Sequence, residues 1–189
     1  MDEQKAIEMG RERMRISKDP IHGIEHAQNV EKHAFEILNS LKDDGWEIDE
    51  EVDENLILLC VWWHDCYKAL LDRKFLINEF LEGFRSAKIA EEELKAFVSE
   101  KRLKMVIDAI RVHNNFAYLL FKGKSLPTLT RILIEADAVD AANIERKKKR
   151  NACSRTVFHK IAIFFVEPFL KFLQKIYIKS PYAKECLWS

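Results

Sequence analysis

Glycine and proline are scarce in this 189-residue chain, which holds five glycines and four prolines. All-β domains need many turns and disordered chains hold few apolar residues, so this composition favours neither class. Hydrophobic residues make up 48% of the chain and include twelve phenylalanines, enough to fill a core. The length is that of one ordinary domain.

Cysteine is also rare, and the four cysteines lie far apart with no Cys-x-x-Cys pair. This spacing argues against a thiolate zinc site or a disulfide framework and fits a reducing compartment. The first residues, MDEQKAIEMGRERMR, are charged and hold no signal-peptide core. No apolar run approaches the ~18 residues that a membrane-spanning helix needs. We therefore expect a cytoplasmic protein without a membrane span.

An excess charge of one sign is absent too, since 31 basic residues balance 31 acidic ones. A protein that holds nucleic acid or an acidic membrane surface usually carries a strong positive field. We therefore expect no stable complex with nucleic acid.

Helical periodicity recurs along the whole chain, and no alternation with a period of two extends over a useful length. The sequence predicts an all-α fold of seven or eight helices. Asp19-Pro20 should end the first helix, Pro127 should open another, and Pro168 should kink the last near Glu167. The helices are expected at about residues 2–17, 24–41, 51–68, 74–83, 86–98, 100–115, 127–149 and 154–179.

An ionisable pair stands at the end of the most apolar segment. Residues 56–63 read LILLCVWW, and His64 and Asp65 follow directly. Moving a charge into an apolar interior costs several kcal/mol or more unless the charge is paired or coordinates a metal. The pair is therefore the first candidate for a functional site.

Two other helices also direct a metal-capable side chain inward. His26 opens an apolar face that continues with Val30, His33, Ile37 and Leu41. Asp137 lies within about 60° of several apolar residues on the helix expected at 127–149. These residues are Leu133, Ile134, Ala141 and Ile144. Glu135 lies nearly opposite, so we expect it to point away from the core, and Asp140 lies at the edge of the apolar face.

Three helices thus direct His26, the pair His64–Asp65, and Asp137 toward one core. Two imidazoles and two carboxylates suit Mn²⁺, Fe²⁺, Co²⁺, Ni²⁺ or Zn²⁺ better than Ca²⁺. Four ligands leave open positions on an ion that prefers six, as a catalytic site requires. A single inward histidine is more often a hydrogen-bonded core residue, but four such residues on three helices are hard to attribute to chance.

The same residues resemble a known family. The order His … His-Asp … Asp, at gaps of 38 and 72 residues, is similar to that of the HD-domain metal-dependent phosphohydrolases. DPIHGIEHAQNV (19–30) resembles the family's D-x-x-H-x-x-x-H run, HDCYK (64–68) its HD-x-G-K segment, and EADAVDA (135–141) its D-A-D-x-x-D-A segment. The resemblance covers about residues 12–145. It implies a helical bundle in a single HD domain over residues 1–189, with 150–189 as a C-terminal helical cover.

The resemblance also implies roles for individual residues. Asp65 and Lys68 would be catalytic, and Lys68 would bind a substrate phosphate as a compact positive charge. His113 would contact the phosphate or protonate the leaving group, and His22 would line the mouth of the pocket. The alternatives are a solvated lysine, a structural histidine and a helix-capping histidine. One divalent cation (Mn²⁺, Fe²⁺, Co²⁺, Ni²⁺, Zn²⁺ or Mg²⁺) would be bound by His26, His64, Asp65 and Asp137.

The chain departs from parts of the family pattern. Tyr67 stands where glycine is frequent. Family members with two metals carry further histidines between the HD pair and the last aspartate, whereas this chain has only His113 there, so we expect a single-metal site. Small nucleotidases of the family tend to carry a glutamate where this chain has Lys68, which argues against that subgroup.

Two further segments have competing interpretations. The run ERKKKR (145–150) could contact RNA or an acidic surface, but such a run is more often a solvated helix end whose cations complement the helix dipole. Residues 160–179 are aromatic, amphipathic and basic, so they could lie on a membrane surface. Packing over the metal domain or in a homodimer interface is their more ordinary role.

The function expected from these features is hydrolysis of a phosphate ester in a nucleotide or another small phosphorylated metabolite, by a water that the metal activates. One alternative is an HD-type nuclease acting on single-stranded nucleic acid, which would need a continuous basic groove. Another is a sensor that binds a ligand without turning it over. The presence of all four ligand positions and of Lys68 argues against a sensor.

Overall fold

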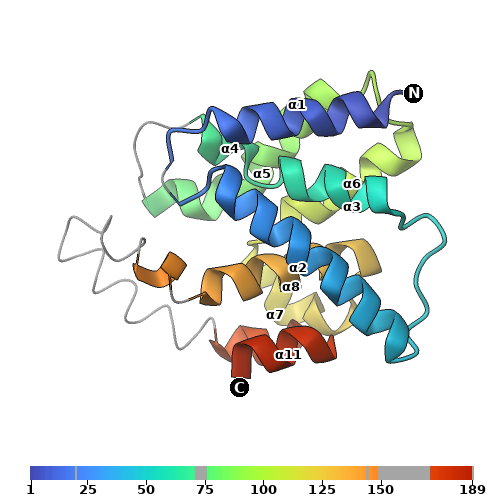
Figure 1. The fold of residues 1–189 in the computed structure, drawn as a ribbon, viewed down its shortest axis with the longest axis vertical. Helices are drawn as coiled ribbons and strands as arrows, with labels where there is room; N and C mark the ends of the chain where they lie inside the picture. Colours follow the sequence, from blue (N-terminus) through green and yellow to red (C-terminus); the bar gives the residue numbers. More distant parts are fainter. Residues whose placement is uncertain (20, 71–75, 144, 149–170, 189) are drawn as a thin grey trace.

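The predicted all-α fold is confirmed by the computed structural model, which describes residues 1–19, 21–70, 76–143, 145–148 and 171–188. Within these ranges the regular structure is helical and includes no strand (Figure 1). None of the described helices is long and apolar enough to cross a membrane.

The candidate site is built on three helices in the middle of the molecule. They are α2 (Ile24–Asp43), α3 (Glu54–Trp63) and α8 (Thr128–Ala142), and α2 packs against both of the others. Figure 1 shows them between α1 (Glu3–Arg15) and α11 (Pro181–Trp188), which lie at opposite ends of the molecule.

Aspartate caps fix the first turns of α1 and α3. Asp2 accepts a hydrogen bond from the backbone amide of Lys5 at 3.0 Å, and Asp53 accepts one from the amide of Leu56 at 2.8 Å. Each cap satisfies a backbone donor that a helix start leaves without an intrahelical partner. The acidic cluster before α3 therefore sets where this apolar helix begins.

The helix predicted at 51–68 is interrupted at the histidine–aspartate pair. Helix α3 ends at Trp63, and the short helix α4 (Cys66–Ala69) follows. Asp65, between them, has φ −106° and ψ 15°, outside the range of regular helix. Neighbouring side chains on a continuous helix do not face the same way. The break removes that restriction, so His64 and Asp65 both reach His26 on α2.

The other predicted boundaries hold in part. One helix, α5 (Leu76–Leu94), replaces the pair predicted at 74–83 and 86–98, and α6 (Glu100–Val112) ends before residue 115. Helix α7 (Phe116–Lys122) and the 3₁₀ turn η1 (Gly123–Ser125) were not predicted. The chain leaves helix at Asn143 and is helical again over 145–148. The predicted kink at Pro168 lies outside the described residues.

Close contact between α1 and α3 depends on Gly10. A Cβ atom at this position would lie 2.8 Å from Trp63 Nε1 and 2.9 Å from Trp62 Cβ, too close for any larger residue. The approach lets Trp63 Nε1 donate a hydrogen bond to the carbonyl of Ala6 at 3.0 Å. Trp63 is fully buried, so it anchors the end of α3 immediately before His64.

The expectation that Glu135 points away from the core is wrong. Its side chain is fully buried, and its carboxylate accepts hydrogen bonds from the backbone amides of Lys179 at 2.7 Å and Ser180 at 3.1 Å. The reason is that the C-terminal segment covers the face of α8 opposite the one that carries Asp137, with α11 packed on both α2 and α8. Helix α8 is therefore buried on two faces.

Candidate metal centre

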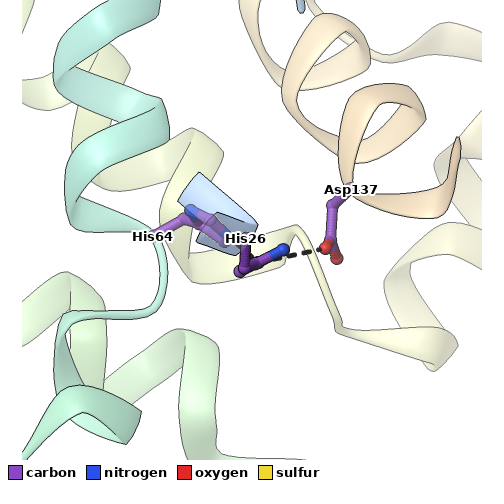
Figure 2. Close-up of side chains that lie close together, drawn as sticks. All are labelled: His26, His64 and Asp137. Carbon is purple, nitrogen blue, oxygen red and sulfur yellow. Dashed lines mark hydrogen bonds and ion pairs between the residues drawn. The ribbon is translucent and has the colours of Figure 1, made fainter. Parts of the chain in front are cut away.

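Four side chains from the three central helices meet at one place. His26 lies in the first turn of α2, His64 and Asp65 occupy the break between α3 and α4, and Asp137 lies on α8. Figure 2 shows the rings of His26 and His64 side by side, with Asp137 reaching toward His26 from the neighbouring helix. The structure thus brings together all four residues expected to bind a metal.

Potential ligand atoms of His26, His64 and Asp137 all lie within 4.8 Å of one another, and Asp65 adjoins them. His26 Nε2 lies 3.1 Å from His64 Nε2, 3.2 Å from Asp65 Oδ2 and 3.6 Å from Asp137 Oδ1. His64 Nε2 lies 3.5 Å from Asp65 Oδ2. Ligand atoms bound at about 2.1 Å lie about 3.0 Å apart at neighbouring octahedral positions and about 3.4 Å apart in a tetrahedron.

The tautomers of the two histidines direct both Nε2 atoms toward each other. His64 Nδ1 donates to the carbonyl of Val61 at 2.7 Å, so its Nε2 carries a lone pair. His26 Nδ1 lies 2.7 Å from Asp140 Oδ2, which can only accept, so this nitrogen also carries hydrogen. Two lone pairs would then face each other across 3.1 Å. A proton or a metal ion between them makes that contact favourable.

Electrostatics gives the two imidazoles opposite pKa shifts. Burial lowers the pKa of His64 to about 4. Burial and the Arg146 guanidinium also oppose the charged form of His26, but hydrogen bonds with Asp140 and Asp65 outweigh them and raise the pKa of His26. Of the two rings, His26 therefore holds a proton more readily than His64.

Asp140 holds His26 in the orientation needed for binding through Nε2. A carboxylate on the far ring nitrogen of a metal-binding histidine fixes its tautomer and increases its basicity. Although burial opposes it, the hydrogen bond with His26 and the charge of Arg146 lower the pKa of Asp140 to about 2. Sequence reasoning placed Asp140 at the edge of the apolar face without a role. Its position one turn after Asp137 was the available signal.

A second acidic group adjoins the first. Asp65, Glu82 and His113 place one potential ligand atom each within 4.8 Å of one another, and His113 Nε2 lies 3.8 Å from Asp65 Oδ1. The Lys68 ammonium lies 2.6 Å from Glu82 Oε2. Burial and the neighbouring Asp65 raise the pKa of Glu82 well above its ordinary value. Sequence reasoning missed Glu82, because nothing distinguishes it from the other glutamates of α5.

Lys68 and His22 lie against each other beside this group. His22 Nδ1 donates to Asp19 Oδ2 at 3.2 Å, which leaves Nε2 to accept from Lys68 Nζ at 3.1 Å. Burial, followed by the charge of Lys68, lowers the pKa of His22 to about 4. The rings of His22 and His26 are 5.7 Å apart. All the sequence-predicted site residues are therefore neighbours in the structure.

The environment of Arg146 differs from the solvated helix end expected for ERKKKR. Its guanidinium contacts Asp140 Oδ2 and His26 Nδ1 and lies 3.9 Å from Asp137 Oδ1. Helix α8 ends before Asn143, and residues 145–148 are helical again. Lys148 is exposed, as predicted for the run.

The neutral histidines predict acid sensitivity of the metal-free protein. His22 and His64 have folded-state pKa values of about 4 against 6.5 unfolded, so the unfolded chain binds more protons between these values and stability falls as pH drops from 6.5 to 4. At about 1.4 kcal/mol per pKa unit, each of the two histidines accounts for up to about 3 kcal/mol of the stability lost over this pH range. The free energy of unfolding, measured with urea at pH 7.5 and at pH 4.5, should fall less between these pH values in His22→Gln than in wild type. Equal losses would contradict the shift assigned to His22.

The comparison with protein families identifies the chain. The model of the HD domain matches residues 23–142, which is more than half of the chain. The chain therefore belongs to the HD-domain family, whose members are generally metal-dependent hydrolases. No curated protein and no solved structure gave a match. The matched region contains His26, His64, Asp65, Lys68, His113 and Asp137. That all 189 residues form a single domain stays a prediction.

Proposed function

We propose that this protein is a phosphohydrolase that cleaves a phosphate ester of a nucleotide or another small phosphorylated metabolite at one divalent cation. The observation that carries the proposal is the convergence of His26 Nε2, His64 Nε2, Asp65 Oδ2 and Asp137 Oδ1, with separations of 3.1–3.6 Å from His26 Nε2. A bound cation would lower the pKa of a water from about 15.7 toward 7 and polarise a phosphoryl oxygen.

The chain's own residues would bind and orient the substrate around that centre. Lys68 carries a compact charge to the edge of the site, where Glu82 and His22 hold its ammonium group. Asn114 Nδ2 donates to Glu82 Oε2 at 2.9 Å and keeps that carboxyl in place. A phosphate oxygen that replaces one of these partners would gain a charge-assisted hydrogen bond.

His113 would act at the leaving-group side. Its Nδ1 donates to the carbonyl of Ile110 at 2.6 Å, so Nε2 is the ring atom that faces Asp65. A proton held at Nε2 can pass to the leaving oxygen as the ester bond breaks. One oxygen of the Asp65 carboxylate faces His113 and the other faces His26 and His64. Asp65 would therefore orient His113 as well as the two candidate metal ligands.

A substrate panel separates this function from its two rivals. Metal-loaded protein is incubated with mononucleotides, dinucleotides, sugar phosphates and short single-stranded DNA. Release of inorganic phosphate supports the phosphohydrolase, whereas cleavage of DNA alone would identify a nuclease. Ligand binding without turnover under any divalent metal would identify a sensor. The net charge of zero favours a small substrate over nucleic acid.

Replacing Lys68 tests the substrate-binding role. Lys68→Gln should lower kcat/KM about 100-fold, because loss of one charge-assisted donor to a transition state costs about 3 kcal/mol. Lys104→Gln, which removes an exposed lysine of α6, is the matched control and should leave kcat/KM unchanged. If both variants keep wild-type kinetics, Lys68 has no part in substrate binding and its contacts with Glu82 and His22 serve stability alone.

A further inference from the structure

Arg146 borders the open side of the candidate metal centre. Three of the candidate ligands have almost fully buried side chains, whereas that of Asp137 is 29% exposed. Among these four side chains, Asp137 is therefore the one with substantial exposure to solvent. The Arg146 guanidinium lies 3.9 Å from Asp137 Oδ1, beside this most exposed candidate ligand.

Arg146 differs from the neighbouring charged residues of its own segment. Lys148 and Glu145 are 69% and 74% exposed at their side chains and pair with each other at 3.0 Å. The Arg146 side chain is only 13% exposed and contacts both Asp140 and the His26 ring. Burying a guanidinium is costly unless it is paired, so the carboxylates of the site are what hold it inward.

These contacts suit the metal-free protein and weaken when a cation binds. Binding through His26 Nε2 keeps a hydrogen on Nδ1, which donates to Asp140. The guanidinium contains only donors, so it competes with Nδ1–H for the same Asp140 oxygen. A divalent cation would also cancel two of the negative charges that Asp65, Asp137 and Asp140 supply, and would reduce the pull on Arg146.

A phosphoryl group on the cation would lie within reach of the released guanidinium. Ligands at neighbouring octahedral positions about 2.1 Å from an ion are about 3 Å apart. A phosphoryl oxygen bound next to Asp137 Oδ1 would therefore come close to Arg146. The planar guanidinium can donate two parallel N–H bonds to a phosphate, a geometry that lysine lacks.

We propose that Arg146 is a substrate-binding residue, which pairs with Asp140 and Asp137 in the metal-free protein and turns to the substrate's phosphoryl group once the cation is bound. The inference rests on the proposed phosphohydrolase function and narrows its substrate class. Lys68 and Arg146 contact different members of the site, so they would bind the phosphate from two directions. The two positively charged side chains favour a dianionic phosphate monoester over a singly charged diester.

Binding of inorganic phosphate to manganese-loaded protein tests the role of Arg146 without turnover. Calorimetry measures Kd for Mn²⁺ and then for phosphate in wild type, Arg146→Gln, Arg146→Lys and the matched control Lys148→Gln. Arg146→Gln should bind phosphate at least tenfold more weakly and Mn²⁺ as tightly as wild type or several-fold more tightly, because a competing cation is gone. Arg146→Lys should bind phosphate several-fold more weakly than wild type, and Lys148→Gln should match wild type.

The outcomes distinguish this inference from the proposed function. Phosphate affinity in Arg146→Gln within twofold of wild type overturns the inference, even if the wild type hydrolyses a substrate. Phosphate binding that depends on Arg146, in a protein that hydrolyses nothing in the panel, supports the inference and removes the hydrolase. Weaker Mn²⁺ binding by Arg146→Gln, with unchanged phosphate affinity, would show that Arg146 only supports the ligands. If Arg146→Gln does not fold, wild-type phosphate affinity in Arg146→Lys overturns the inference.

Discussion

Asp65→Ala should lose bound metal and lower kcat/KM by about three orders of magnitude or more, while the protein remains folded and helical. Asp65 Oδ2 lies 3.2 Å from His26 Nε2 and 3.5 Å from His64 Nε2, so its removal leaves the cation with one carboxylate and two neutral imidazoles. A thousandfold loss corresponds to about 4 kcal/mol of transition-state stabilisation. The helices should persist because Asp65 lies in the break between α3 and α4, outside both.

Metal analysis and circular dichroism on the same preparation check this expectation. Asp108→Ala is the matched control, because Asp108 is an exposed aspartate of α6 whose partner is Arg111, one turn away. The control should retain metal, helical signal and activity. An Asp65→Ala protein with full metal content and full activity would remove Asp65 from the site. An unfolded Asp65→Ala protein would show that Asp65 is needed for the fold of the bundle.

Glu135→Leu should destabilise the protein strongly, because it removes a fully buried carboxylate that joins α8 to the C-terminal segment. The carboxylate accepts from the amides of Lys179 and Ser180 and lies 3.6 Å from the buried guanidinium of Arg131. Removing one partner of a buried ion pair leaves the other charge uncompensated and costs about 3 kcal/mol. For a chain of this length, that lowers Tm by roughly 10 °C.

Thermal unfolding of Glu135→Leu and of the control Glu91→Leu checks this prediction. Glu91 is an exposed glutamate of α5, so its replacement should shift Tm by no more than a few degrees. Since Glu135 lies on the face of α8 away from the metal site, metal content of folded Glu135→Leu should match wild type. Equal Tm values for the two variants would show that the C-terminal segment is held by other contacts.

Local sequence patterns sufficed to predict that His26 and Asp137 point toward one place from regular helices. His26 and Asp137 each follow the apolar face of one helix, so a period of 3.6 residues locates them. The pair His64–Asp65 was found by its apolar surroundings. The break in the helix between them could not be predicted, because residues 61–69 contain no glycine or proline. At the break, the Asp65 side chain contacts His26 on α2, which lies 39 residues earlier in the sequence.

The residues that sequence reasoning missed or misplaced depend on packing between distant segments. Glu135 follows the expected angle on α8, but the C-terminal segment converts that face into a second buried surface. Glu82 is one of several glutamates on α5, and only the fold places it against Lys68. Arg146 reads as part of a basic run, and only the fold places it against Asp140. Helical periodicity contains no signal for such long-range contacts.

The most direct test of a single-cation centre is anomalous diffraction from crystals grown with Mn²⁺. One peak per chain is expected, within about 2.2 Å of His26 Nε2, His64 Nε2 and one oxygen each of Asp65 and Asp137. The contradicting result is the absence of an anomalous peak between these atoms at saturating Mn²⁺, in protein whose four side chains are arranged as described. That result would rule out the metal centre and the chemistry assigned to it.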